Sequence, residues 1–283
     1  MSPVHRVAEV FDAIQQAKTG ATAFCTNFFP VQARLQSWID QEQMLSEPHD
    51  GAIFFLRKDR DFWHLYFCAS NLPSLQREIP ALSSLNTEPV VLDLIGSEAA
   101  LADLRGLFQT FSFRPYARLI RLARAAASLL SPSDGEMAGV RGSESAPQVT
   151  FANATDAQPI LSLLESSFDR YADQLPMPCE IEAAIANQHI LTIKISGALT
   201  ALLFFETQGL TSTVRYWAVP QPFRSHRLGS ALMRHYFAAH SAVRRFILWV
   251  TANNDSALQK YQHYGYAPDG LVDHVLANAR IRP

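Results

Sequence analysis

The chain has few cysteines, and those it has are far apart. Its 283 residues include three of them, Cys25, Cys68 and Cys179, with no Cys-x-x-Cys pair and no His-rich tract. An odd count without paired spacing argues against a disulfide framework and against a zinc-type cluster. We therefore expect reduced thiols, no metal site and no catalytic cysteine.

Long apolar runs and an excess of charge of one sign are also missing. No stretch approaches the roughly 18 uninterrupted apolar residues that a membrane span needs, and residues 1–16 include acidic side chains where a secretory signal needs an apolar core. The formal net charge of −2 argues against a general nucleic-acid surface, and the arginines at 118–124 and 244–245 are interpreted as a solvated face. We expect a cytoplasmic protein with no nucleic-acid or membrane partner, and leave a homodimer open.

The composition is that of a globular protein of about two domains. Hydrophobic residues make up 48% of the chain and charged residues 18%, which is enough to build packed cores. Residues 128–147 replace apolar periodicity with Ser, Gly, Pro and charge, which is typical of a flexible linker. This predicts a first domain at 1–127, a linker at 128–147 and a second domain at 148–283.

Hydrophobic periodicity predicts alternating helices and strands on both sides of this linker. Helices are expected at 4–17, 31–44, 72–82, 99–108, 157–168, 180–187, from 228 onward and from 254 to 264, and strands at 52–57, 62–69, 90–95, 190–195, 198–207, 211–219 and 246–251. The pattern indicates an α/β fold with a mixed sheet in each half.

Residues 219–233 form the most informative stretch, a strand end that runs through a polar loop into a helix. The strand before it is rich in β-branched and aromatic residues, and Leu228, Leu232 and Met233 then recur at helical spacing. A helix N-terminus exposes backbone N–H groups without intrahelical partners and carries a partial positive charge, so it favours an anion. Arg224 and Arg227 add side-chain donors, which together predict a phosphate site.

This loop resembles motif A of the GNAT acyltransferases, Arg/Gln-x-x-Gly-x-Gly/Ala, whose amides wrap the pyrophosphate of acyl-coenzyme A. The matching positions are Arg224, Arg227 and Gly229. Arg227 replaces the first glycine of the pattern, which either forces a different backbone angle or places a cation beside the phosphates. The resemblance implies cofactor contacts from Trp217, Ala218, Val219, Arg224, Ser225, His226, Arg227, Leu228, Gly229, Ser230 and Asn254.

A second GNAT pattern, Asn-x-x-Ala-x-x-x-Tyr-x-x-x-Gly-Phe, lies downstream in the expected order. The chain supplies Asn254, Ala257, Tyr261, Gly265 and Tyr266 at the same intervals, with tyrosine in place of the final phenylalanine. Two spaced motifs make residues 148–283 similar to a GNAT domain. The family's strands splay apart so that backbone groups pair with the pantetheine arm, which implies acetyl-CoA or another acyl-CoA as co-substrate.

The chemistry needs an acid for the departing thiolate. A tyrosine with a pKa near 10 can protonate a thiolate whose conjugate acid lies near 8 to 9, so Tyr261 is the predicted acid, with aromatic packing as its alternative role. Asn254 either caps its helix, contacts the cofactor or does both. Glu206 is the predicted general base, while Asp169 and Glu180 are further candidates, and each of the three has a surface carboxylate as its alternative.

The first half loosely repeats the second. Residues 107–116 align with 258–268, which sets Phe108 at the position of Tyr261 and Ser112 at that of Gly265. Phenylalanine cannot donate a proton, and residues 72–80 stand where a phosphate loop belongs. We predict that the first domain is a degenerate GNAT-like copy.

The predicted function is an acyl-CoA-dependent N-acyltransferase, most simply an N-acetyltransferase, that moves an acyl group directly to a primary amine. Three alternatives remain at this point. The donor can be a carrier-protein thioester, because it presents the same pantetheine arm. The chain can also be a non-catalytic regulatory module that binds acyl-CoA, or an interaction scaffold with no ligand.

Overall fold

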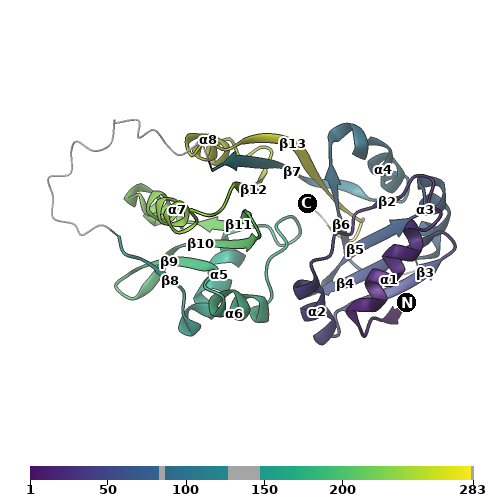
Figure 1. Cartoon of the computed structure of the whole chain (residues 1–283), viewed down its shortest axis with the longest axis horizontal. Coiled ribbons are helices and arrows are strands. Elements are labelled where there is room, and N and C mark those ends of the chain that lie inside the picture. Colours follow the sequence, from purple (N-terminus) through teal and green to yellow (C-terminus); the bar gives the residue numbers. More distant parts are fainter. Residues whose placement is uncertain (83–86, 127–146, 282–283) are drawn as a thin grey trace. The chain divides into compact units, whose positions relative to one another are not determined.

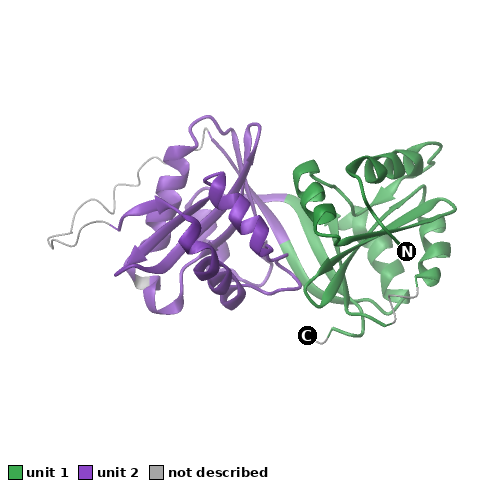
Figure 2. Ribbon diagram, turned by 90° about the horizontal axis from the view of Figure 1, so that it is seen from below, with its two compact units in different colours: residues 1–119, 270–283 green, residues 120–269 purple. Residues whose placement is uncertain are grey.

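The computed structural model describes residues 1–82, 87–126 and 147–281, with the side chain of Ser225 excepted (Figure 1). All but the last residue of the predicted linker, 128–147, lies outside the described residues. The chain divides into two compact units (Figure 2). Unit 1 comprises Met1–Leu119 and Gly270–Pro283, and unit 2 comprises Ile120–Asp269.

The compact units depart from the predicted domain boundaries at two strands. Residues 120–125, placed in the first domain from the sequence, belong to unit 2, and residues 270–283, placed in the second, belong to unit 1. Their strands, β7 (Arg114–Ala125) and β13 (Ala267–Ala277), were not predicted. Their ladder partners are distant in the sequence, so no local pattern could assign them.

Unit 1 is a mixed sheet with helices. Its further elements are β1 (Ser2–Pro3), α1 (Val7–Lys18), β2 (Cys25–Thr26), α2 (Gln32–Asp40), β3 (Met44–His49), β4 (Ala52–Asp59), β5 (Phe62–Ala69), α3 (Leu72–Glu78), a 3₁₀ turn (Ile79–Ala81), β6 (Val90–Gly96) and α4 (Glu98–Thr110). The strand order is β1-β3-β4-β5-β6-β13, and β2 pairs with β5 off this path. Only the β5–β6 pair is parallel among the pairs described in this unit.

The apolar faces of α1 and α2 cover one face of this sheet. Val10 and Ile14 of α1 recur at helical spacing and pack in one core with Leu35 of α2 and with Phe55 and Tyr66 of β4 and β5. The strands β4 and β5 are buried along almost their whole length, which explains their near-continuous apolar sequence.

The end of the chain closes the sheet of unit 1. Val272 to Ala277 of β13 pair antiparallel with Gly96 to Val91 of β6. The side chain of Asn278 then accepts a hydrogen bond from Val90 N at 3.1 Å and donates one to Glu88 O at 2.7 Å. These contacts anchor the C-terminal strand, so unit 1 depends on residues from both ends of the chain.

The strands of unit 2 form a mixed sheet region between two pairs of helices. Its further elements are β8 (Val149–Phe151), a 3₁₀ turn (Ala154–Asp156), α5 (Ala157–Ser167), α6 (Pro178–Ala186), β9 (Ile190–Ile195), β10 (Ala198–Gln208), β11 (Thr211–Ala218), a 3₁₀ turn (Gln221–His226), α7 (Leu228–Ala239), β12 (Arg245–Thr251) and α8 (Asp255–His263). The strand order is β7-β12-β11-β10-β9-β8. The β11–β12 pair is parallel, whereas β8–β9, β9–β10 and β10–β11 are antiparallel.

Alternation along the strands of unit 2 builds a core on each face of the sheet. Every second residue of β11 is buried, as the period of a strand demands. One core takes Leu232 and Tyr236 of α7 together with side chains from α8, and the other takes Ile160 of α5 and Ile181 of α6. The sheet therefore lies between α7 and α8 on one face and α5 and α6 on the other.

The structure of strand β7 corrects the interpretation of the arginines at 118–124 as a solvated face. Leu122 joins the core of unit 2, and Arg124, expected in a solvated face, is only 3% exposed. The Arg124 guanidinium carbon lies 4.0 Å from the ring centroid of Phe237, a cation–π contact. Arg121 and Arg245 also have a shared partner, Asp269, rather than a solvated role alone. No helix among the described residues is long and apolar enough to cross a membrane.

Candidate active site

The parallel strands β11 and β12 pair over only part of their length. The pairing runs from Thr211 with Arg245 to Val214 with Leu248 and stops there. On its other edge, β11 continues to pair with β10 as far as Ala218. The second half of β11 therefore has one paired edge and one edge turned toward a gap, which we call the β11–β12 opening.

A cavity of about 600 Å³ lies at this opening. It is lined by side chains of β11, the loop that follows, the first turn of α7 and much of α8. The lining residues are Ser167, Phe168, Trp217, Ala218, Val219, Arg224, Arg227, Gly229, Ser230, Asn254, Ser256, Ala257, Gln259, Lys260, Tyr261, His263 and Tyr264. Eight of the eleven predicted cofactor positions are among them.

Three predicted cofactor positions do not line the cavity. Leu228 is buried in the core under α7, because it begins the apolar stripe of that helix. His226 is exposed, and its ring lies 6.1 Å from that of Phe223. The side chain of Ser225 lies outside the described residues. These three positions stay predictions, resting on the motif.

The loop before α7 keeps the backbone of a glycine motif without its first glycine. Arg227 has φ 56° and ψ 17°, in the left-handed region that glycine adopts freely and other residues adopt at a cost. The sequence left open whether Arg227 forces a different backbone angle or adds a cation. The left-handed angle is kept, and Arg227 also lines the cavity. The site combines the turn with an added cation.

Position 229 requires a glycine because the ring of Trp217 lies close to its backbone. A Cβ placed on it would lie 2.8 Å from Cζ2 of Trp217, closer than real Cβ contacts. Arg227, the N-cap residue of α7, makes no side-chain capping hydrogen bond, so its side chain does not occupy the donors of the first turn. Arg224 is held at the same end by Nε–H donation to Val219 O at 3.2 Å. This end of the cavity is suited to an anion.

Helix α8 forms the opposite wall. The side chain of Asn254 accepts a hydrogen bond from Ala257 N at 3.1 Å, so the predicted capping role is present. Asn254 also lines the cavity. Gly265, with φ 79°, then ends the helix in the left-handed conformation.

Tyr261 lies on α8 and contacts the aromatic side chains around it. Its ring centroid is 5.5 Å from that of Trp217 and 6.0 Å from that of Tyr266. Burial raises the pKa of its phenol, and the negative charge of Asp173 raises it further. The phenol is therefore protonated at neutral pH and is available as a proton donor at the cavity.

Glu206, the predicted base, does not line the cavity. It lies on β10 opposite Thr213, and its Oε1 accepts a hydrogen bond from Nη1 of Arg215 at 2.7 Å. The sequence did not predict this ion pair with Arg215, which gives the Glu206 carboxylate a structural role.

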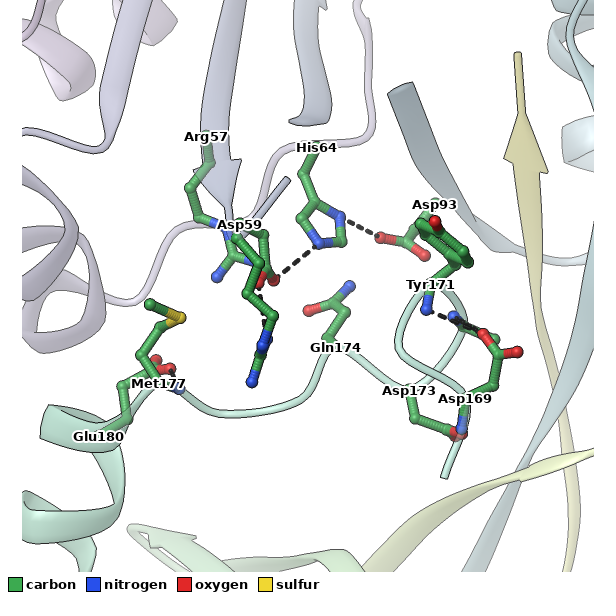
Figure 3. A network of polar contacts seen from close by, with 12 residues as sticks. Arg57, Asp59, His64, Asp93, Asp169, Tyr171, Asp173, Gln174, Met177 and Glu180 are labelled. Atoms are coloured by element: carbon green, nitrogen blue, oxygen red, sulfur yellow. Dashed lines mark hydrogen bonds and ion pairs between the residues drawn. The ribbon is translucent and has the colours of Figure 1, made fainter. Parts of the chain in front are cut away.

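The other two carboxylates considered from the sequence cap backbone groups. Asp169 Oδ1 accepts from Tyr171 N and Ala172 N at 2.8 and 2.9 Å, in the segment between α5 and α6 (Figure 3). Glu180 Oε2 accepts from Met177 N at 2.8 Å at the start of α6. Asp173, in the same segment, was not singled out, since only the fold brings its charge near Tyr261.

In unit 1, the strands equivalent to β11 and β12 also part, but the chain itself fills the gap. Pairing between β5 and β6 stops after His64 and Val91. Beyond this point Asn27, only 7% exposed, donates to Leu65 O at 3.0 Å and to Asp93 O at 3.1 Å, and accepts from Phe67 N at 2.7 Å. A side-chain amide thus bridges the two strands in the β5–β6 opening.

The two units also end their last helices alike. Phe113 N donates to Phe108 O, as Tyr266 N donates to Tyr261 O, and Ser112 has φ 66° where Gly265 has φ 79°. Phe108 is fully buried and contacts Phe67 and Phe113. This hydrogen-bond correspondence supports the predicted alignment, with Phe108 in the place of Tyr261.

A buried ionic cluster occupies the strand ends of unit 1 next to this gap. Nε2 of His64 lies 3.3 Å from Asp59 Oδ2, and its Nδ1 lies 3.8 Å from Asp93 Oδ2 (Figure 3). Burial and the charge of Arg57 lower the pKa of His64, although both carboxylates oppose this. No group of three or more His, Cys, Asp or Glu residues in the described part of the chain is arranged to hold a metal ion.

No protein-family model matches the sequence, and no curated protein matches it. Solved structures do match. A tandem GNAT protein from the clavulanic acid biosynthesis pathway has a TM-score of 0.63 at 8% identity, over 100% of this chain and 98% of that one. A GCN5-related N-acetyltransferase from Kribbella flavida has a TM-score of 0.56 at 14% identity, over 89% and 97%. Another, from Sphaerobacter thermophilus, has a TM-score of 0.54 at 13% identity, over 81% and 76%.

These similarities, together with the two sheets and their openings, show the fold. The chain has the fold of the GCN5-related N-acetyltransferases, in a tandem arrangement of two α/β units. The fold expected from the motifs is thereby confirmed.

Proposed function

We propose that unit 2 is an acyl-CoA-dependent N-acyltransferase, most simply an N-acetyltransferase, which transfers the acyl group directly to a primary amine. One observation carries the proposal. The parallel strands β11 and β12 part at Val214 and Leu248, beside both the uncapped N-terminus of α7 and the phenol of Tyr261.

The opening suits the long arm of coenzyme A. β12 leaves one edge of this part of β11 unpaired, so backbone groups within Trp217 to Val219 can pair with the amides of a pantetheine chain. The pyrophosphate would then meet the first-turn amides of α7, with Arg224 and Arg227 as cationic donors. A carrier-protein thioester presents the same arm and remains the alternative donor.

The chemistry follows from the presence of Tyr261 in the cavity wall. The amine attacks the thioester carbonyl, whose oxygen can be polarised by a strand amide in the manner of an oxyanion hole. The C–S bond breaks, and the phenol of Tyr261 protonates the departing thiolate. Because burial raises the pKa of Tyr261, the phenol holds its proton at neutral pH, and loss of solvation in the same site would also raise the basicity of the departing thiolate.

The acceptor class stays as wide as the sequence left it: a small metabolite, an aminoacyl or sugar amine, or a protein terminus. A cytoplasmic location and a homodimer also stay predictions. Unit 1 has no place in the chemistry, because Asn27 bridges its opening and Phe108 stands in the place of the acid.

The test is Tyr261→Phe in the full chain, which keeps the ring against Trp217 and Tyr266 and removes only the hydroxyl. With acetyl-CoA and a panel of primary amines, release of the thiol should slow by about 10²- to 10⁴-fold, while affinity for acetyl-CoA is kept. A regulatory module would bind acetyl-CoA without turnover in either protein. A scaffold would bind none.

A further inference from the structure

Helix α8 presents a row of polar side chains to the cavity. Ser256, Lys260 and His263 follow one another at intervals of four and three residues, so they share one side of the helix. All three are exposed, and all three line the cavity. Ala257 and Tyr261, on the neighbouring side, pack against the core of unit 2. We call the exposed row of three residues the α8 rim.

The permanent charges that line the cavity have one sign. They are the cations of Arg224, Arg227 and Lys260, and no Asp or Glu stands among the described residues of the lining. The chain as a whole has a formal net charge of −2, so the lining departs from the composition. Because opposite charges attract and like charges repel, the cavity suits a ligand with several negative charges.

Lys260 differs from the other three lysines of the chain in having no partner among the described residues. The ammonium groups of Lys18 and Lys58 lie over aromatic rings, 5.3 and 4.5 Å from the ring centroids. That of Lys194 lies 2.6 Å from Oδ1 of Asp156. The ammonium of Lys260 makes no ion pair, hydrogen bond or ring contact within the described ranges. Its three N–H donors are therefore available to an anion in the cavity.

Coenzyme A has one phosphate more than the proposed function has placed. Its pyrophosphate is assigned to the first turn of α7, with Arg224 and Arg227 as donors. The third phosphate is a monoester on the 3′-oxygen of the ribose, and such a group carries about −1.5 to −2 charges at neutral pH. It needs a cation of its own. Among the described residues of the lining, Lys260 is the permanent cation that remains.

The pantetheine arm of a carrier protein ends differently. Its phosphate is a diester to a serine, with a single charge and no nucleoside. The first turn of α7 can hold that phosphate, but the ammonium of Lys260 would then meet no anion. Lys260 therefore favours the nucleotide form of the donor.

We infer that Lys260 binds the 3′-phosphate of coenzyme A at the α8 rim, so that unit 2 selects free acyl-CoA over the thioester of a carrier protein. This inference rests on the proposed function, whose donor it narrows. Because Lys260 is exposed, the contact is an ion pair in water, and its strength depends on ionic strength.

The experiment titrates the intact protein calorimetrically with acetyl-CoA and with acetyl-dephospho-CoA, which lacks only the 3′-phosphate, at low ionic strength. The wild type should bind acetyl-CoA about fivefold more tightly. Lys260→Met should bind the two ligands equally, with its affinity for acetyl-dephospho-CoA kept at the wild-type value. Added salt should reduce the preference of the wild type. Acetyl-phosphopantetheine, which ends as the carrier arm does, should bind equally to the two proteins.

Three further variants sharpen the comparison. Lys260→Arg keeps a cation and should keep most of the preference. Lys18→Met removes an exposed lysine that does not line the cavity, so it changes the net charge equally and should leave the preference intact. Arg224→Met should weaken the binding of both ligands by the same factor, because the pyrophosphate is common to them. Methionine is a good helix former, and thermal unfolding of Lys260→Met checks that α8 is retained.

The outcomes separate this inference from the proposed function. If the wild type binds both ligands equally, or if Lys260→Met keeps the wild-type preference, Lys260 does not bind the 3′-phosphate, although the function stands. A rise in KM confined to amines that carry a carboxylate would place Lys260 at the acceptor instead. If neither ligand binds, the proposed function fails and this inference fails with it. If the preference depends on Lys260 but no amine is acetylated, the transfer step fails while the phosphate contact stands.

Discussion

Each unit has an opening between two parallel strands, but a cavity lies at the opening of unit 2 and a side chain bridges the opening of unit 1. In unit 2, β11 and β12 part after Val214 and Leu248, and a cavity of about 600 Å³ lies there. In unit 1, β5 and β6 part after His64, and Asn27 bridges them. The splayed strands are therefore a property of the fold, and the segment between the first two helices of each unit decides whether the opening can receive a ligand.

The corresponding segment of unit 2 takes another course. It is tied to β11 through the hydroxyl of Tyr216, and none of its residues 169–177 is among those lining the cavity. In unit 1, Thr26 pairs with Cys68 of β5, and its hydroxyl donates to Phe67 O at 2.6 Å. The segment in unit 1 thus makes the contacts with a strand edge that a pantetheine arm is proposed to make in unit 2.

The largest expected effect comes from removing the bridge in unit 1. Asn27→Ala deletes two donors and one acceptor from a buried position, and each buried polar group that loses its partner costs about 1–3 kcal/mol. Chemical denaturation should show a clear loss of stability, while calorimetry shows unchanged acetyl-CoA affinity.

Asn71→Ala is the matched control for this variant, because it removes a single capping bond to Ser74 N in the same unit. It should cost about 1 kcal/mol. An Asn27→Ala protein as stable as the wild type would contradict the proposed role of the bridge.

A smaller effect is expected from Gly229→Ala, in unit 2. The added Cβ would lie 2.8 Å from Trp217 Cζ2, so the indole must shift within the cavity wall. We expect about a tenfold loss of acetyl-CoA affinity, equivalent to about 1.4 kcal/mol, measured by titration. Gly106→Ala is the control, since a Cβ there meets nothing within 4 Å. Equal affinities in the two variants would argue against a donor site beside Trp217.

Arg227→Gly should give the smallest effect, with opposite signs in two measurements. Glycine relieves the left-handed backbone at φ 56°, which favours the folded protein by about 1 kcal/mol. Loss of the cation should weaken acetyl-CoA binding, less so at high salt. Arg224→Gly should weaken binding without raising the melting temperature, because φ is not positive there. A stabilised Arg227→Gly protein with full affinity would show that the arginine does not contact the phosphates.

Local patterns predicted most elements that build the site. The predicted strand 246–251 corresponds to β12 (Arg245–Thr251), and Asn254 caps α8 as expected. The helix predicted at 31–44 is shorter, Gln32–Asp40, because β3 begins at Met44. Capping, strand alternation and helical spacing are readable along the chain because each depends on residues a few positions apart.

Features that depend on distant residues were not predictable. The strands β7 and β13 have partners far along the chain, so their residues carry no local sign of the sheets they join. Asn27 bridges carbonyls 38 and 66 residues away, and Glu206 meets Arg215 only across a hairpin. Asp173 likewise gains its relation to Tyr261 from the fold.

The most direct test of a single donor site is calorimetric titration of the full chain with acetyl-CoA and with free coenzyme A. The chain must be intact, because pieces cut at 1–127 and 148–283 would each lack a strand of the unit they are meant to form. One site per chain, weakened by Gly229→Ala and unaffected by Asn27→Ala, is the predicted result. Two sites per chain, or one site that Asn27→Ala alters and Gly229→Ala does not, would contradict the assignment of donor binding to unit 2.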